Sequence, residues 1–431
     1  MLTAFGRAFR TPDLRRKLLF TLALIGVYRL GSVLPGPGVS YVAIQGCLQQ
    51  VQDSSLYGLV NLFSGGALLQ LSVFALGIMP YITSSIIIQL LVVVIPRLET
   101  LKKEGQAGQA KLTQYTRYLT VALAILQSTG IIALARSGRL FPNCNQAIIP
   151  DDSLFRIIVL VTTLTAGTAV VMWLGELVTD RGVGNGMSVL IFTSIISSVP
   201  GQAANLLQRP NGPLVLAAVG LLVLVVIALV VFVEQAQRRI PVQYAKRQIG
   251  RRMYGGTSTY IPLKVNQAGV IPVIFASSLL YLPQLLSNVW TSNETFTQFI
   301  NRFLSPSDPL YLITYFGLIV FFTYFYVAIT FNPVEVSDNM KKYGGFVPGI
   351  RPGRATAEYL DHILSRITSF GALYLGLIAV LPYVLFSLTS DAAQSTPFGG
   401  TAILIIVGVG LETVKQVESQ LMLRNYEGFL R

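Results

Sequence analysis

Long apolar runs alternate with short polar, basic segments along the whole chain. A helix needs about 20 predominantly apolar residues to cross the hydrocarbon core of a bilayer. On this pattern we predict ten membrane spans, at about residues 18–34, 67–95, 118–135, 157–174, 183–200, 214–233, 268–286, 310–331, 367–388 and 401–414. An even number of spans places both termini on the same side of the membrane.

Composition supports the same class. The 431 residues are 52% hydrophobic and 12% charged, which is about half the charged fraction of a soluble protein. The first apolar run ends in Pro35-Gly36-Pro37 without a small-residue cleavage site, so we expect it to remain as a span. The expected fold is an all-α integral membrane protein.

Basic residues fix the predicted orientation. Of the 32 lysines and arginines, 26 fall on the side that holds the termini. The positive-inside rule then places both termini and the large basic loops, at about 234–267 and 332–366, in the cytoplasm. Arg29, near the outer end of the first span, is expected to snorkel toward the membrane interface.

A Pro- and Gly-containing external connector at residues 201–213 divides the spans five and five. Odd numbers force opposite orientations on the two halves, 1–200 and 214–431, so any kinship between them would be an inverted pseudo-repeat around a central pore. The sequence shows no strong self-similarity, and this expectation rests on the span count alone.

The stretch from Asn61 to Pro96 is interrupted by Ser64-Gly65-Gly66. Such a break at membrane depth is tolerated where the freed backbone is buried in protein or lines a cavity. After it, four side chains spaced four, three and four residues apart form one helical stripe that changes from aliphatic to polar: Ile78, Ile82, Ser85 and Gln89. The stripe predicts a pore or binding site, with ordinary helix packing as the alternative.

The sequence contains few of the residue types that form metal sites or catalytic clusters. One histidine and two cysteines provide no metal site, and we expect no cofactor and no catalytic cluster. Glu176, Glu234 and Glu412 fall near the ends of spans, so the interior is predicted to be chemically neutral. A neutral, aliphatic path favours a passive conduit. The alternatives are an ion-coupled secondary transporter, which requires charges in mid-membrane, and an integral-membrane enzyme, which requires a convergent catalytic cluster.

Several segments in order resemble the bacterial SecY family over almost the whole chain. They are NLFSGGALLQLSVFALGIMPYITSSIIIQLL, KKEGQAGQAKLTQYTRYLT, MWLGELVTDRGVGNGMS, QRRIPVQYAKRQIGRRMYGG, YIPLKVNQAGVIPVIFASS, FNPVEVSDNMKKYGGFVPGIRPG and FGGTAILIIVGVGLETVKQVES. The resemblance implies the protein-conducting channel of the Sec translocon in a bacterial inner membrane, which passes unfolded preproteins and releases membrane proteins laterally. It also implies as partners SecE, SecG, SecA, the ribosome, preprotein and nascent membrane-protein clients, membrane lipids and accessory translocon subunits.

The resemblance assigns roles to residues of this chain. It implies a plug at about 56–70 that includes Asn61, Leu62, Phe63, Ser64, Gly65, Gly66 and Ala67, and a lateral gate between the second, third and seventh spans with Ser85, Gln89, Gln127 and Asn266. It places the pore ring at Ile78, Ile82, Met187, Ile191, Ile274 and Ile405. Met187 departs from the usual aliphatic pattern, and its flexible thioether would loosen the seal slightly.

The resemblance further implies that the basic loops dock SecA or the ribosome through Arg238, Arg239, Lys246, Arg247, Arg251, Arg252, Arg351 and Arg354. Topological anchoring and contact with anionic lipids remain the alternative for these charges. The two cysteines, Cys47 and Cys144, lie in predicted external loops where thiols can be oxidised, so a disulfide between them is a further possibility from the topology.

Overall fold

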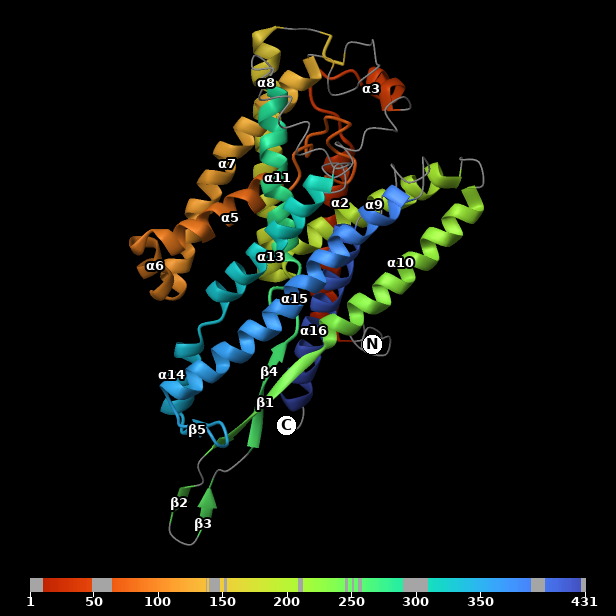
Figure 1. The fold of residues 1–431 in the computed structure, drawn as a ribbon. Coiled ribbons are helices and arrows are strands. Elements are labelled where there is room, and N and C mark those ends of the chain that lie inside the picture. The colour runs from red at the N-terminus through yellow and green to blue at the C-terminus, as the bar shows by residue number, and fades with distance from the viewer. Residues whose placement is uncertain are drawn as a thin grey trace.

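Helices make up most of the molecule in the computed structural model (Figure 1). The structure describes residues 11–48, 64–136, 138, 148–150, 153–207, 212–244, 247–249, 252–254, 258–289, 309–388 and 400–427. Within these residues, six helices are long and apolar enough to cross a membrane, or seven if one bent pair counts as a single span. The chain is therefore a helical protein with multiple spans.

A first group of helices precedes residue 212. It comprises α2 (Pro12–Val33), α3 (Tyr41–Leu48), α5 (Met79–Val94), α6 (Pro96–Lys103), α7 (Gln106–Arg136), α8 (Leu154–Arg181) and α9 (Gly186–Leu207). Within the group α5 packs on α7, α7 on α8, and α8 on α9, while α2 packs on both α8 and α9.

A second group follows. It comprises α10 (Gly212–Gln235), α11 (Ile271–Val289), α13 (Pro309–Thr330), α14 (Pro333–Lys342), α15 (Arg354–Leu388) and α16 (Gly400–Glu427). Here α11 packs on α13, α13 on α15, α15 on α16, and α16 on α10. Local sequence sets the element ends: Asn332 accepts hydrogen bonds from the amides of Val334 and Glu335 (3.1 and 3.4 Å), and Pro333 takes the first turn, so α14 starts there.

The two groups meet along two seams. At the first seam, α11 of the second group packs against α5 and α7 of the first. At the second seam, α9 of the first group packs against α10 and α16 of the second. A large hydrophobic cluster joins residues from both groups, so the core of the molecule lies between the seams.

A small sheet extends from one end of the helices, beside α14 and the end of α16 (Figure 1). Strand β1 (Gln237–Tyr244) pairs antiparallel with β4 (Ser258–Lys264) and with β5 (Gly345–Phe346), in the order β4-β1-β5. A second pair, β2 (Arg247–Ile249) with β3 (Arg252–Tyr254), continues the hairpin. The expectation of an all-α fold overlooked these strands, because an alternating strand in a basic loop has no membrane signal.

The second predicted span, 67–95, is wrong as a continuous helix. Residues 65 to 78 form turns, with positive φ at Gly65, Gly66, Gly77 and Leu71, and α5 begins only at Met79. Beyond Ile95 the axis bends by 101° into α6. Ile95 is extended (φ −101°, ψ 111°), as the residue before a proline prefers, and this ends α5.

The count of ten spans is not reached in the described residues. Apolar parts of α9 and α11, at Gly186–Gly201 and Ile271–Leu280, are shorter than a full span. Other helices run farther than predicted, because α7 starts at Gln106 and α15 at Arg354, inside segments predicted as loops. Hydropathy locates the apolar part of a helix and misses the polar turns that continue it.

Candidate functional site

The six residues of the predicted pore ring lie in one hydrophobic cluster. Five are buried, with exposed fractions of 8% or less, and Met187 packs partly buried against them. They come from both seams. Ile78 directly precedes α5 and Ile82 lies in its first turn, while Met187 and Ile191 lie on α9, Ile274 on α11 and Ile405 on α16. The structure thus gathers side chains that are far apart in sequence.

Local sequence fixes where the α9 residues lie. The Asn185 side chain accepts hydrogen bonds from the amides of Met187 (3.1 Å) and Ser188 (3.4 Å), so the helix starts there and its second residue is Met187. The Met187 sulfur lies against Gly175 of α8, and Gly186 lies against the carbonyl of the same glycine. Small residues let these helices approach closely, as they do in membrane bundles.

Five of the six predicted ring side chains are aliphatic, and the sixth is the thioether of Met187. Contacts between such side chains are weak and non-directional.

The turn at Ser64 follows directly on the predicted plug residues Asn61, Leu62 and Phe63, which lie outside the described residues. Ser64 and Ala67 are buried, and the Ser64 hydroxyl accepts a hydrogen bond from the Leu68 amide (3.2 Å). Gly65 (φ +64°) and Gly66 (φ +92°) adopt left-handed conformations that favour glycine. The break read from the sequence is thus a compact, buried turn.

Arg29 has hydrogen-bond acceptors within the protein. Its Nη1 donates to the Gly65 carbonyl oxygen at 2.8 Å and to the Ser32 hydroxyl at 3.3 Å. An arginine inside an apolar run needs acceptors, and the broken backbone after residue 63 supplies one. The unpaired carbonyls expected at the glycine break were the signal that could have predicted this contact.

The helices of the predicted lateral gate do meet at the first seam, but its polar residues do not form one hydrogen-bonded cluster in the described chain. Gln89 donates to Ser85 on its own helix (3.4 Å), and Gln127 is buried on α7. Asn266 precedes α11 and donates to Glu234 Oε1 (2.6 Å) and to the Gly269 carbonyl (3.0 Å). Asn266 therefore joins the ends of β4 and α10 and bonds to neither glutamine.

Sequence reasoning missed the pair of Asn266 and Glu234. Asn266 has an exposed fraction of only 2%, and its Oδ1 has no hydrogen-bond partner. Its Nδ2 satisfies the partly buried Glu234 carboxylate, which would otherwise lose a partner away from water.

We expect Asn266→Ala to lower the thermal midpoint of the detergent-solubilised protein, because it removes a hydrogen bond to a charged group worth about 1.5–3 kcal/mol. Gln89→Ala is the matched control, since Gln89 makes only a long bond within its own helix. Circular dichroism during heating measures both. Equal midpoints for the two variants would show that the bond to Glu234 contributes no more to thermal stability than the long bond between Gln89 and Ser85.

The two basic loops form one body. The strands of the first loop, β1 and β4, share a sheet with β5 of the second, and buried residues from both loops and α15 form a common core: Ile240, Val242, Leu263, Met340, Val347, Leu360 and Ile363. The pairing of the two loops was not predicted from the sequence, because β1 and β5 are about 100 residues apart and their pairing leaves no local signal.

Two of the predicted docking residues of the first loop have described side chains. Arg238 and Arg239 are exposed on β1, and the Arg239 guanidinium lies 4.8 Å from the centre of the Tyr260 ring. Lys246 and Arg251 lie outside the described residues, and for Arg247 and Arg252 the structure describes only the backbone, in β2 and β3.

Arg351 projects from a braced turn. Gly349 and Gly353 have φ of +82° and +102°, the Ser337 hydroxyl donates to the Gly353 carbonyl (2.6 Å), and the Thr356 hydroxyl donates to the Arg351 carbonyl (2.9 Å). These bonds fix the backbone while the Arg351 side chain stays exposed. The exposed Arg354 instead pairs with Glu358 (2.9 Å).

Cys47 is fully buried in α3, and its thiol is not free. Cys144 lies outside the described residues, so the pairing of Cys47 with Cys144 remains a prediction.

We expect neither cysteine to react with a membrane-impermeant maleimide in intact cells until a reductant is added, because a disulfide blocks both sulfurs. Changing Cys47 to serine should then free Cys144 for labelling without reduction. Full labelling of Cys144 in the unreduced wild-type protein would exclude the bond.

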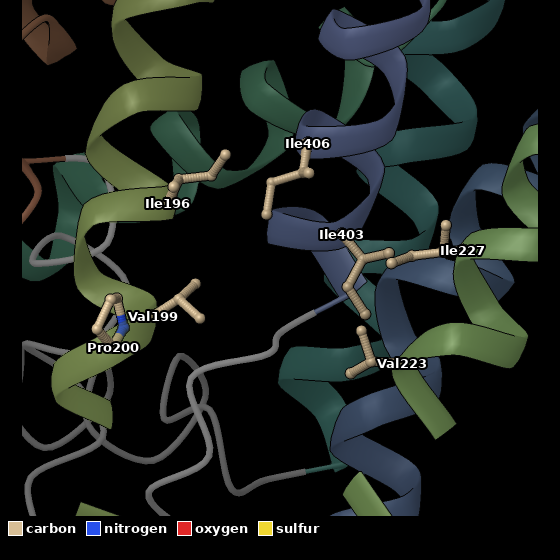
Figure 2. Close-up of a pocket in the computed structure, with 7 residues that line it drawn as sticks. All are labelled: Ile196, Val199, Pro200, Val223, Ile227, Ile403 and Ile406. Atoms are coloured by element: carbon tan, nitrogen blue, oxygen red, sulfur yellow. The ribbon is translucent and has the colours of Figure 1, made fainter. Parts of the chain in front are cut away.

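A cavity of about 310 Å³ lies at the second seam (Figure 2). Its wall is entirely nonpolar, with residues from α9, α10 and α16: Ile196, Val199, Pro200, Val223, Ile227, Ile403 and Ile406. No polar group converges there, so the cavity has no chemistry to offer a reacting substrate. In the described residues, no group of three His, Cys, Asp or Glu side chains is placed to hold a metal ion.

Comparison with known proteins points in one direction. The SecY family profile matches residues 72–414. Curated relatives include the protein translocase subunit SecY of Streptomyces coelicolor (65% identical), Streptomyces scabiei (64%) and Mycobacterium bovis (59%), each over 100% of both chains. Among solved structures, a protein-conducting channel aligns with a TM-score of 0.63 and 17% identity, over 94% of this chain and 91% of the other. Sec61 from a canine ribosome–channel complex aligns with a TM-score of 0.58, also at 17% identity, over the same shares of the two chains.

Proposed function

Because this chain belongs to the SecY family, we propose that its six clustered residues form the constriction through which polypeptides cross the membrane. The chain is a channel subunit of the Sec translocon, a multi-pass membrane protein and not an enzyme. The observation that carries the proposed path is the origin of the ring: its residues come from α5 and α11 at one seam and from α9 and α16 at the other. A path between two helix groups has to pass their common core.

The proposed ring acts by excluding water and by binding no particular polypeptide segment tightly. Aliphatic side chains exclude water and ions from an idle channel, and they hold no segment of a passing chain strongly. The flexible Met187 side chain adapts to cargo of different width. An ion-coupled carrier is disfavoured, because none of the six ring side chains carries an ionisable group.

We propose ten spans in two halves, 1–200 and 214–431, related as an inverted pseudo-repeat. The order of helix neighbours supports this: α5–α7–α8–α9 pack in sequence in the first group, as α11–α13–α15–α16 do in the second. Likewise α2 packs on α9 as α10 packs on α16. The first seam is then the lateral gate, where Gln89 and Gln127 provide polar groups that bias closure without locking it.

The segment at 56–70 is proposed as the plug of the channel. The body formed by β1, β4, β5 and their shared core, here called the sheet body, is proposed as the docking platform for SecA or the ribosome. Exposed arginines on β1 and at the Arg351 turn suit both an acidic protein surface and ribosomal RNA phosphate. The fold shared with Sec61 in a ribosome-bound channel supports the ribosome as a partner. We further propose SecE and SecG as membrane partners, a bacterial inner-membrane location and cytoplasmic termini.

Reconstitution tests this function. The purified chain is placed in vesicles with SecE and SecA, and a radiolabelled preprotein is supplied with and without ATP. Protease-protected preprotein that depends on ATP, on this chain and on an intact signal sequence is the expected result. Import that is unaffected by omission of this chain would refute the function.

A further inference from the structure

Beside the first seam, a charged side chain links the two helix groups. Lys102 of α6 donates from its Nζ to the Ile329 carbonyl oxygen near the end of α13, at 3.3 Å. Helix α6 belongs to the first group and α13 to the second, and Figure 1 shows α6 next to the end of α13 that leads to α14. The bond therefore joins two parts of the chain that are 227 residues apart.

The Ile329 carbonyl needs a donor from outside its own helix. In an α-helix this oxygen would accept a hydrogen bond from the amide four residues later, which here is residue 333. Pro333 has no N–H, and it occupies the first turn of α14. Helix α13 ends at Thr330, so the carbonyl also lies at the negative end of the helix dipole, where a cation is favoured. A lysine side chain meets both requirements.

The backbone that carries Lys102 is fixed to the first group. The chain bends by 101° between α5 and α6, and α6 packs on both α5 and α7. Gly108 of α7 lies so close to the Leu101 carbonyl that a side-chain carbon added at this glycine would overlap it. The Glu104 amide closes α6 by donating to the carbonyls of Thr100 and Leu101 (3.1 and 3.2 Å). Lys102 therefore moves together with α5 and α7.

The acceptor is fixed to the second group. Phe331, which follows α13, packs against the core of the sheet body and against a small cluster that contains Ala268, just before α11. The Phe331 amide donates to the Val327 carbonyl at 3.0 Å. The Ile329 carbonyl thus lies where α13 continues toward the sheet body, and it moves with the second group.

We propose that Lys102 is a positioning residue that straps the first group to the end of α13 and so holds the first seam closed in the idle channel. Helix α11, which forms this seam with α5 and α7, packs directly on α13. Widening of the seam moves α11 and α13 away from α5 and α7, and the bond from Lys102 then breaks. One exposed bond of this kind biases the seam without locking it. The inference rests on the proposed role of the first seam as the lateral gate.

Distances across the seam test the strap. Spin labels are introduced as unnatural amino acids at Ile125 of α7 and Leu279 of α11, whose exposed fractions are 46% and 43%. The chain with its partner subunits is placed in lipid nanodiscs, with and without a synthetic signal peptide, and pulsed electron paramagnetic resonance gives the ratio of open to closed seams. Wild type, Lys102→Ala, Lys102→Arg and Lys103→Ala are compared. Lys103→Ala is the matched control, because Lys103 pairs with Glu99 of its own helix (2.6 Å).

We expect Lys102→Ala to raise the ratio of open to closed seams about threefold in the absence of peptide, the scale set by one exposed cation at a helix C-terminus. Lys102→Arg should keep the wild-type ratio, since a guanidinium also donates to a carbonyl, and Lys103→Ala should leave it unchanged. If the signal peptide fails to widen the wild-type seam, the gate role fails and the strap with it. If the peptide widens the seam but Lys102→Ala behaves as wild type, or if Lys102→Arg or Lys103→Ala opens the seam as much as Lys102→Ala, the strap alone is refuted.

Discussion

Replacing Ile82 or Ile274 by Asn is expected to raise the idle ion leak about tenfold and to permit export of clients with defective signal sequences. Both side chains are buried in the ring cluster, with exposed fractions of 8% and 7%. An amide in a dry constriction offers hydrogen bonds to water and lowers the barrier to wetting, and a change of about 1.4 kcal/mol corresponds to that tenfold effect. Single-channel conductance and an export assay with signal-defective clients measure the two consequences.

Ile319→Asn is the matched control for this prediction. Ile319 is fully buried in the same hydrophobic cluster but lies on α13, which takes no part in either seam. The cost of burying an amide is then similar, and the ring remains aliphatic. We expect this control to be less stable but not leaky. Equal leak for Ile319→Asn and the two ring variants, or no leak in any of them, would remove Ile82 and Ile274 from the constriction.

The second large effect is expected from Arg351→Glu. Insertion and association with SecE should stay intact, because the braced turn that carries Arg351 belongs to the sheet body outside the helices. Transport driven by SecA or coupled to the ribosome should fall about tenfold, since a reversed charge opposes docking of an acidic surface or of phosphate. Import into vesicles and translation-coupled insertion measure the two modes.

Arg366→Glu separates docking from anchoring. Arg366 is an exposed arginine of α15 in the same predicted cytoplasmic segment, so its reversal changes the topological charge by the same amount. Normal transport by Arg366→Glu beside impaired transport by Arg351→Glu supports docking. Loss of both variants from the membrane would instead favour anchoring, and normal transport by both would refute the docking role of Arg351.

What the sequence predicted well were features with a local signal. Apolar runs revealed α10 and the cores of α7, α8, α13, α15 and α16, and the glycines at 65 and 66 marked the broken segment. Family resemblance identified ring residues that the structure places in one cluster, although nothing in their spacing connects Ile82 with Ile405. That they form a conducting constriction remains a proposal.

The misses share one cause, which is pairing between distant parts of the chain. The hydrogen bond from Arg29 to the Gly65 carbonyl was not predicted, because the sequence does not reveal that the two residues are neighbours. The hydrogen bond from Asn266 to Glu234, 32 residues earlier, was likewise not predicted. The β4-β1-β5 sheet joins two loops that hydropathy treats as separate. Each contact depends on tertiary packing that local patterns do not encode.

Photocrosslinking of a stalled client tests the path through the ring most directly. A photoreactive amino acid is placed at Ile82, Ile191 or Ile405, and at Ile319 and Leu221 as controls, the latter 67% exposed on α10. A preprotein with a folded C-terminal block is then stalled during ATP-driven import. Crosslinks to the stalled chain are expected from all three ring positions and from neither control. Crosslinks from Leu221 or Ile319 without any from the ring would place the translocating polypeptide elsewhere.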